Sequence, residues 1–423
     1  MTTTIGMNKA QSLADMDVDS ALQQTVWEAQ VATEKVLYSP MLQNLKSFGS
    51  DVITVDDQKS MSLPMNKCII NVAPSNKAAR RVTMAFLQAL ASPGVYGTTT
   101  LIASEEDRRL KSCSAYANDW KHGVPADRYG ITYREASPYK IHQAAKRDLA
   151  KWHGENQDYF LHAAIIEGRS PNLASAPVSL NQPLNSQCFV MGASIASQPA
   201  RFSDDDGGTD MEDEVGDFLK DVTYTNCRST VPRLLDLMKF ARLTRYINPL
   251  NLPDGDGYLY FAHPDEVSYL RDASQTNSFG SQWLSGAAIQ DSKQVVPGLR
   301  FKIGELYVCE DPRAATYTVA GSNCVFTGSV GYMMHGRTDN RATGTTANTH
   351  FNINILMGAE AVFYMETEAP HYEKQLDEYS QYENIAYVGA DGYCRTDWNV
   401  DTNNDDTPTV QHEGSMCVFT QRA

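Results

Sequence analysis

Two acidic stretches carry the side chains best suited to bind a divalent cation. Residues 203–214 hold seven carboxylates around Gly207 and Gly208, and calcium and magnesium prefer oxygen ligands of this kind. Their spacing matches no metal-binding loop, so we favour a solvated insertion over a cation site. Residues 401–405 begin like a calcium loop, but Asp406 stands where that loop needs glycine and no glutamate follows at its twelfth position. We therefore expect no bound metal.

Cysteine and histidine side chains could supply nucleophiles, general bases or soft metal ligands. No C-x-x-C pair occurs, so we expect eight free thiols from a reducing compartment, with no disulfide and no zinc site. His142, His153 and His162 fall on or near one long helical pattern, where a packed or solvated role is favoured over a catalytic one. The cysteines are Cys68, Cys113, Cys188, Cys227, Cys309, Cys324, Cys394 and Cys417.

Sequence motifs of the common enzyme classes are missing. There is no G-x-S-x-G elbow, P-loop, dinucleotide-binding glycine fingerprint or H-E-x-x-H pair. A glycosidase-like pair of carboxylates stays open in so acidic a chain, but no spacing supports it. We predict no catalytic, cofactor-binding or metal-binding residues, and hence no enzyme.

The element that would position many of these side chains is a long helix over residues 137–168. Ser137 can cap it, Pro138 suits its first position, and Gly168 stands where a left-handed residue ends a helix. At 1.5 Å per residue it would be about 45 Å long. Apolar side chains recur at helical period and predict one buried face: Ile141, Ala145, Leu149, Trp152, Tyr159, Ala163 and Ile166.

Length and charge narrow the class of protein. The chain has 423 residues, of which 42% are hydrophobic and 21% charged, enough to bury the core of two or three subdomains. No apolar run reaches the ~20 residues of a membrane span, and residues 1–19 lack a signal-peptide pattern, so we expect neither membrane insertion nor secretion. The net charge of −15 argues against a nucleic-acid-binding protein.

The first third of the chain reads as an arm followed by strands. Residues 1–50 are weakly amphipathic, with a helix predicted over 21–36 that either lies on another surface or packs on its own domain. Residues 51–73 and 80–91 read as strands, and 111–120 as a strand that returns after a turn-rich tip at 92–97. A two-stranded ribbon is marginal alone in water. We therefore predict that residues 76–130 form a two-stranded ribbon that lies on another surface.

The remaining chain mixes helices and strands without regular βαβ alternation, which predicts an α+β fold. Residues 171–200 read as loop. A helix is predicted at 230–243 with Leu234, Leu235, Met238 and Ala241 inward, and another begins at Pro264 with Val267 and Leu270 on its core side. Strands are predicted at 258–262, 301–303, 306–309, 385–398 and 415–420, and residues 352–365 are strongly apolar.

Several short stretches, taken in one order along the chain, resemble parts of a known family. They are Gly94-Val95-Tyr96-Gly97 with Leu101 and Glu105-Glu106; residues 144–168 around Leu149, Trp152, Asp158 and Ala163; Tyr258-Leu259-Tyr260-Phe261-Ala262-His263-Pro264-Asp265 with Leu270-Arg271; Ile355-Leu356-Met357-Gly358-Ala359-Glu360-Ala361; and Glu383-Asn384-Ile385-Ala386 with residues 392–398. Together they resemble the major capsid proteins of tailed bacteriophages with the HK97-like fold. More narrowly, they are similar to the coat proteins of the short-tailed coliphage that carries a virion RNA polymerase.

The resemblance implies a division of the chain into five parts. Residues 1–75 would be the N-terminal arm and first extended segment, and 76–130 the extension loop, a β-ribbon. Residues 131–170 would form the spine helix of the peripheral domain, 171–365 the axial domain, and 366–423 the return strands of the peripheral domain and the C-terminus. Residues 203–214 and 337–350 have no place in the family pattern.

The function implied is that of a structural coat protein in the icosahedral shell of a double-stranded DNA phage. Its partners would be copies of itself in hexamers and pentamers, the portal, and scaffold, cement or decoration proteins. Packaged DNA would be bound only weakly and without sequence preference, with no membrane and no cofactor involved. The protein would assemble in the host cytoplasm and reside in the virion. The alternatives are an encapsulin-like compartment shell and, from another class, a cytosolic hydrolase without a recognisable motif.

Overall fold

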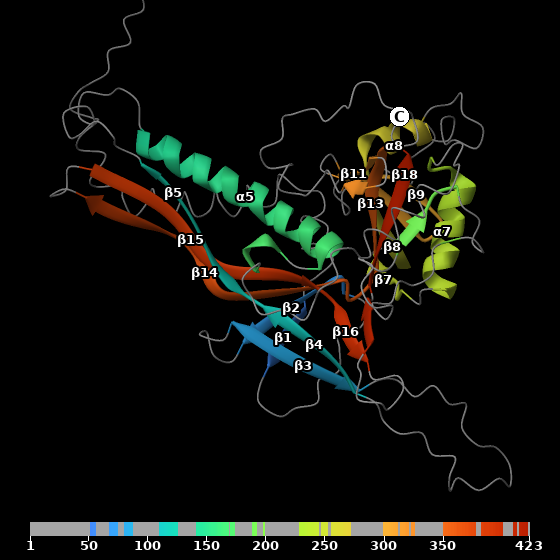
Figure 1. The fold of residues 1–423 in the computed structure, drawn as a ribbon, viewed down its shortest axis with the longest axis horizontal. Helices are drawn as coiled ribbons and strands as arrows, with labels where there is room; N and C mark the ends of the chain where they lie inside the picture. Colours follow the sequence, from blue (N-terminus) through green and yellow to red (C-terminus); the bar gives the residue numbers. More distant parts are fainter. Residues whose placement is uncertain are drawn as a thin grey trace, which may run out of the picture. The chain divides into compact units, whose positions relative to one another are not determined.

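A computed structural model describes about half of the chain (Figure 1). Several sequence predictions fall outside the described residues: the helix at 21–36, the tip at 92–97, the helix start at Ser137, and the acidic stretches 203–214 and 401–405. The polar segment 337–350 is described only at its last residue. The described ranges are 51–55, 67–74, 80–87, 110–125, 141–168, 170–173, 188–192, 198, 228–244, 247–252, 255–271, 299–311, 314–320, 323–325, 350–377, 382–400, 409–412 and 414–421.

A five-stranded sheet has the order β1-β2-β14-β15-β5. Strand β1 (Asp51–Val55) runs parallel to β2 (Ile69–Pro74), and β2 runs parallel to the first residues of β14 (Val362–Asp377). Strand β15 (Tyr382–Arg395) lies between β14 and β5 (Asn118–Pro125). Distant parts of the sequence thus meet in one sheet, as the predicted α+β class requires.

A four-stranded sheet has the order β17-β16-β4-β3, and it corrects the prediction of a two-stranded ribbon. Strand β3 (Arg81–Leu87) pairs with β4 (Leu110–Tyr116) as expected, but β16 (Asp397–Val400) and β17 (Thr409–His412) extend the sheet. Side chains of β3 and β4 also share a buried core with β2 and β14. Strands β3 and β4, which form the base of the predicted ribbon, therefore pack on their own subunit.

The strand predicted at 111–120 is two strands, because the chain changes sheets at Ala117. Strand β4 ends at Tyr116 and β5 begins at Asn118 in the five-stranded sheet. The Ala117 N–H donates to the Arg80 carbonyl at 3.0 Å, which closes the β3–β4 ladder at this point. Alternation of apolar residues continues through such a crossing, so the sequence pattern does not reveal it.

A nine-stranded sheet has a main path β12-β11-β13-β8-β10-β9, with β18, β6 and β7 paired beside it. Strand β8 (Gly255–Ala262) pairs with β7 (Leu250–Leu252), β10 (Leu306–Glu310) and β13 (His350–Met357). Strand β9 (Leu299–Ile303) joins β10 through the predicted turn at Gly304, whose φ is 58°. The outer strands are β11 (Ala315–Ala320), β12 (Asn323–Val325), β18 (Ser415–Gln421) and β6 (Cys188–Val190).

Strand β6 lies in a region predicted to be loop, which corrects that prediction. It has only three residues, and its identity as a strand depends on parallel pairing with β18. Short runs of this kind carry no periodicity. The return of residues 415–421 to the same sheet as residues 188–357 is likewise a long-range pairing.

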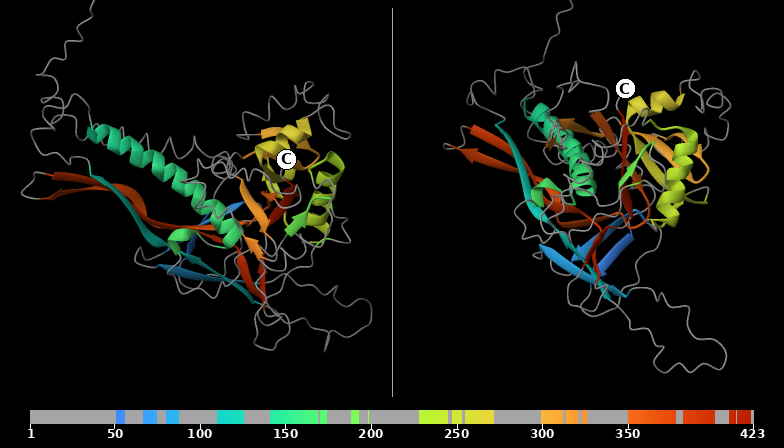
Figure 2. Two further views of the ribbon diagram at one scale, coloured as in Figure 1. Left: turned by 45° about the horizontal axis from the view of Figure 1, so that its top comes forward. Right: turned by 45° about the vertical axis from the view of Figure 1, so that its right-hand side comes forward.

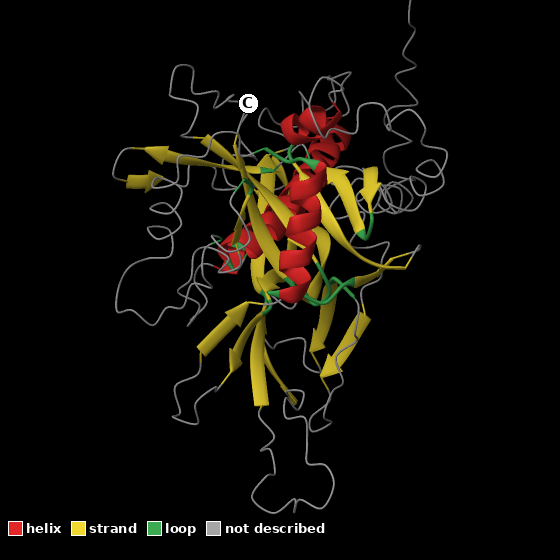
Figure 3. Ribbon diagram, turned by 90° about the vertical axis from the view of Figure 1, so that its right-hand side faces the viewer, coloured by secondary structure: helices red, strands yellow, loops and turns green. Residues whose placement is uncertain are grey.

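Helices α7 (Val231–Leu243) and α8 (Pro264–Arg271) pack on one face of the nine-stranded sheet (Figures 1 and 2). Leu234 and Ala241 are buried as predicted, but Leu237 and Phe240 replace Leu235 and Met238 as the other fully buried residues. Val267 and Leu270 of α8 join the same core, as predicted. Figure 3 shows the mixture of helices and strands that defines the α+β class.

The long helix α5 spans Ile141–Glu167, 27 residues, and it ends as predicted at Gly168, whose φ is 89°. Leu149, Ala163 and Ile166 are buried as the apolar stripe predicts, whereas Trp152 and Tyr159 are half-buried. Residues 160–166 are buried on every side of the helix, including His162. A single amphipathic face therefore does not describe this C-terminal part of the helix. The sequence could not show this because the extra partners come from distant strands.

The chain divides into two compact units. The smaller comprises residues 1–39, 121–157 and 371–388, and the larger comprises 40–120, 158–370 and 389–423. In the smaller unit His122 stacks on Trp152 with ring centroids 4.4 Å apart, and His153 meets the edge of Tyr387 at 4.9 Å. The five-part division implied by the resemblance remains a prediction.

Within the larger unit, a turn at residues 358–361 joins β13 to β14; it donates hydrogen bonds to three other segments and accepts one from a fourth. Glu360 has a φ of 60°, which is uncommon for a side chain other than glycine. Gly414 packs so closely on this turn that a Cβ there would lie 2.6 Å from the Ala359 carbonyl oxygen. The bonds run between Gly358 and Gly414, Ala359 and Asn248, Glu360 and Lys67, and Thr396 and Glu360.

We expect the Leu149→Ala variant to lower the free energy of unfolding by about 2–5 kcal/mol, because it removes a fully buried side chain and leaves a cavity. Chemical denaturation of the unassembled chain measures this. Asp148→Ala is the matched control, since Asp148 is exposed on the same helix. A loss for Leu149→Ala no larger than that of the control contradicts the packing described.

Candidate functional site

A buried charge pair is the most distinctive polar arrangement among the described residues. His162 of α5 is 1% exposed, and its Nε2 lies 2.7 Å from an oxygen of the Asp311 carboxylate. Its Nδ1 lies 2.9 Å from the backbone carbonyl of Asp158, one turn earlier in the helix. Both ring nitrogens thus face acceptors, which favours the doubly protonated imidazolium.

The position of Asp311 is fixed by the sheet. It follows β10, and its N–H donates to the Ala262 carbonyl of β8 at 2.8 Å. Burial alone would lower the pKa of His162, but the carboxylates of Asp311 and Asp158 raise it to about 9. At neutral pH His162 is therefore a buried cation that fastens α5 to the end of β10.

This His–Asp arrangement does not form a catalytic site. A general base must reach its substrate, whereas His162, Asp158 and Asp311 are all buried. Both nitrogens of the ring already bind groups of the fold. The sequence predicted a packed or solvated His162 on the helix, and the structure shows it packed; no sequence signal pointed to Asp311, which is 149 residues away.

A second buried cation, Arg395 of β15, closes the C-terminal end of α5. Its NH1 donates to the carbonyls of Ile165 and Ile166 at 3.3 and 3.2 Å, and its backbone N–H donates to the Gly168 carbonyl. A cation at this end of a helix also interacts favourably with the helix dipole. Sequence reasoning missed Arg395, because an arginine inside a strand pattern carries no signal for a helix terminus.

The turn after α5 is held by the same strand. Ser170 exchanges hydrogen bonds with Tyr393: its N–H donates to the Tyr393 carbonyl at 2.9 Å, and its Oγ accepts from the Tyr393 N–H at 3.1 Å. The Asn172 amide donates to the Asp391 carbonyl at 2.6 Å. Gly392 is needed because a Cβ there would lie 2.5 Å from the Tyr116 carbonyl oxygen.

The other candidates from the sequence have no shared site. His153 is buried in the smaller unit, and the side chain of His142 lies outside the described residues. The cysteines at 68, 113, 188, 309, 394 and 417 are buried. Burial raises the pKa of the Cys68 thiol and raises that of Cys417 to about 12, so neither is a ready nucleophile.

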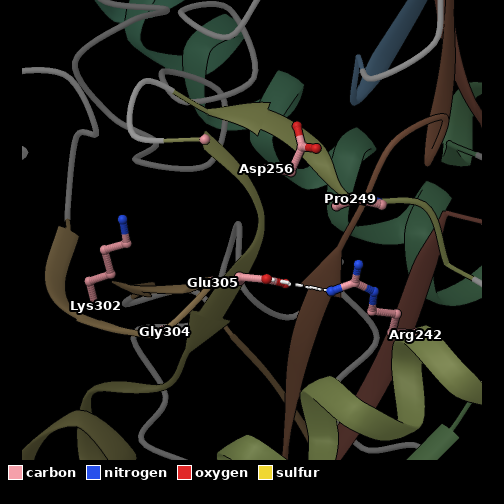
Figure 4. A pocket seen from close by; sticks show the side chains of 7 residues that line it. Arg242, Pro249, Asp256, Lys302, Gly304 and Glu305 are labelled. Carbon is pink, nitrogen blue, oxygen red and sulfur yellow. Dashed lines mark hydrogen bonds and ion pairs between the residues drawn. The ribbon is translucent and has the colours of Figure 1, made fainter.

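An open hollow of about 340 Å³ lies beside α7 and the β9–β10 turn (Figure 4). Its charged side chains already interact: Arg242 NH1 lies 3.2 Å from a carboxylate oxygen of Glu305, and the Lys302 ammonium lies over the Tyr307 ring at 4.7 Å. Arg242 and Glu305 are largely solvent-exposed, so this pair stabilises the fold little. The hollow offers no set of converging, unpaired groups for a ligand.

The described residues form neither a metal-binding cluster nor a membrane-spanning helix. No group of three or more His, Cys, Asp or Glu side chains in the described ranges is arranged to hold a metal ion. No described helix is long and apolar enough to cross a membrane.

Comparison with known proteins points to one kind of fold. No protein-family model matches the sequence, and no curated protein matches it significantly. The structure is similar to the capsid of Ralstonia phage GP4, with a TM-score of 0.55 and 15% identity over 89% of this chain and 94% of that chain. It is also similar to the acidic stable capsid structure of Helicobacter pylori bacteriophage KHP30, with a TM-score of 0.55 and 11% identity over 88% and 95%.

The asymmetric unit of the cyanophage Pam1 capsid gives a TM-score of 0.51 at 13% identity, over 86% of this chain and 95% of that chain. The chain therefore has an α+β fold of the HK97-like capsid type, which confirms the fold class predicted from the sequence. Identities this low establish the fold only.

We expect the proton on His162 to give the protein a pH-dependent stability. Its folded pKa of about 9 exceeds the ordinary 6.5, so the stabilisation is full below pH 6.5 and is lost as pH rises through about 9. Between about pH 7.5 and 9.5 the loss of this proton should lower the free energy of unfolding by on the order of 2 kcal/mol. Buried thiols such as Cys68 and Cys417 lower it further in this range, because they ionise more readily in the unfolded chain. In urea titrations the fall should therefore be smaller in His162→Gln than in the unmodified protein by about the His162 contribution.

His371→Gln is the control, because His371 is 42% exposed. It should retain the pH dependence of the unmodified protein. An unchanged dependence in His162→Gln would show that His162 does not carry this proton.

Proposed function

We propose that this chain is the major capsid protein of a double-stranded DNA bacteriophage and self-assembles into its icosahedral shell. The observation that carries the proposal is the likeness of the fold to phage capsid structures over almost the full length of both chains. The short stretches that resemble the tailed-phage coat proteins support it independently, because they occur in one order along the sequence. The narrower coliphage family named by that resemblance is part of the proposal.

The buried charges support a structural role over an enzymatic one. His162 and Arg395 bind carbonyls and carboxylates of their own fold, at the end of the long helix. Their effect is to fix α5 relative to the strands around it. A shell subunit needs such a rigid frame, because small tilts in each copy accumulate around a closed surface.

The proposal includes assembly with other copies in hexamers and pentamers, and contact with a portal and with scaffold, cement or decoration proteins. Assembly in the host cytoplasm and residence in the virion follow from the same role. With a net charge of −15, the chain would bind packaged DNA weakly and without sequence preference, near the 10⁻⁴–10⁻⁶ M usual for non-specific contacts. Shell closure, and not adhesion, would then retain the genome.

Electron microscopy of the purified full-length chain tests the proposal. Closed particles or rings of subunits are expected, because a shell protein forms them without any substrate. A monodisperse monomer at every concentration and salt tried would contradict the proposal. Large particles able to hold a phage genome fit the capsid; small particles with a protein cargo would favour an encapsulin-like compartment.

We expect deletion of residues 93–100 to leave a folded chain that assembles poorly. The strands that lead to this tip, β3 and β4, pack on their own subunit, so the tip is not needed for the core. Sedimentation velocity would measure assembly. A chain in which the same eight positions are replaced by glycine and serine is the control for loop length. Particles of normal size and stability from the deletion would contradict a role for the tip in assembly.

A further inference from the structure

A buried carboxyl group lies beneath helix α8, away from His162 and Arg395. Glu266, in the first turn of α8, is 1% exposed. One of its oxygens, Oε2, accepts a hydrogen bond from the Ser229 N–H at 3.0 Å. Ser229 lies two residues before α7, so this bond joins the beginnings of the two helices that cover the nine-stranded sheet.

Among the described residues, no cation forms an ion pair with Glu266. Arg228, the described cation that acts most on it, has its guanidinium 4.8 Å over the ring of Tyr269. His263, just before α8, lies beside Asp265, with Nδ1 3.4 Å from that carboxylate. An ionised carboxylate buried without a partner is costly, so burial favours the neutral acid.

The surroundings can accept the proton of a neutral acid. The hydroxyl groups of Tyr260 and Ser229 are buried and make no close hydrogen bond to any described residue. Asn354 of β13 is already used, since its Oδ1 accepts from the His263 N–H and its Nδ2 donates to the Thr420 hydroxyl of β18. Tyr260 of β8 is the other titratable group facing Glu266, and burial raises its pKa far above neutrality.

We propose that Glu266 is a proton-operated latch that, as a neutral acid, donates to a hydroxyl of this cluster and holds α8 and the start of α7 on the sheet. Loss of the proton leaves a buried charge that the Ser229 N–H and the hydroxyls of Ser229 and Thr420 stabilise less well than water would, and this loosens α8. Burial raises the pKa of Glu266 to about 7, although the Ser229 N–H, Arg228, and the hydroxyls of Ser229 and Thr420 act in the opposite direction.

The proton on Glu266 gives the packing of α8 a stability that depends on pH. Because the folded pKa exceeds the ordinary 4.5, the stabilisation is full below pH 4.5 and is lost as pH rises through about 7. Lowering the pH therefore stabilises the packing of α8 on the sheet, and raising the pH above about 7 weakens it.

Hydrogen–deuterium exchange of the full chain, followed at the amides of α8 and corrected for intrinsic rates, tests the latch. From about pH 5 to about pH 7.5 the opening equilibrium constant should rise up to about 100-fold. Glu266→Gln keeps a neutral side chain at every pH and should abolish the rise. Asp265→Asn, at a more exposed carboxylate in the same turn, should retain it. Equal rises in Glu266→Gln and the unmodified protein would overturn the proposal.

A second variant covers the case in which Glu266→Gln fails to fold. Thr420→Val removes a hydroxyl that favours the ionised form of Glu266 and keeps the shape of the side chain. It should extend the rise in the opening of α8 to higher pH, because the neutral acid then persists to higher pH. A rise over the same pH range as in the unmodified protein would overturn the latch.

Discussion

The packing of α5 depends on a charge pair that is buried where water cannot solvate it. His162 and Asp311 come from segments 149 residues apart, and without His162 the buried carboxylate of Asp311 would lose the cation that lies 2.7 Å from it. Removing one partner of such a pair destabilises a protein by about 3–5 kcal/mol, because the remaining charge stays buried and unpaired. The pair therefore specifies one position for the helix rather than merely adding stability. Arg395 then caps the helix end, and Gly168 turns the chain toward Ser170 and its bonds to β15.

Polar contacts between distant segments also fix the chain where β13 passes into β14. The turn at 358–361 is bonded to four segments that are far apart in sequence, and it holds Glu360 in the left-handed region. At each such junction the polar groups form hydrogen bonds within the fold. This pattern fits a protein whose task is to keep its shape while its surface contacts other copies. It is also why the perturbed groups His162 and Glu266 suggest dependence on pH and not catalysis.

Much of this fold could be predicted from the local sequence. The parts that could not be predicted have one cause in common. The long helix, its glycine end, the strand at 258–262 and the helix from Pro264 all follow from periodicity and capping residues. Strand β6, the break at Ala117 and the added strands β16 and β17 follow from pairing between distant segments. The same holds for the buried charges: His162 was expected to be packed, but Asp311, Arg395 and the burial of Glu266 leave no mark in local pattern.

A double-mutant cycle on His162 and Asp311 measures most directly whether this pair governs the packing of the helix. The variants are His162→Gln, Asp311→Asn and the double substitution, compared by free energy of unfolding near neutral pH. The exposed pair Arg242 and Glu305 supplies the reference, where a coupling of only about 0.2–1 kcal/mol is expected. The account predicts a coupling of about 2–3 kcal/mol between His162 and Asp311. Additive losses, with a coupling no larger than that of the exposed pair, would contradict it.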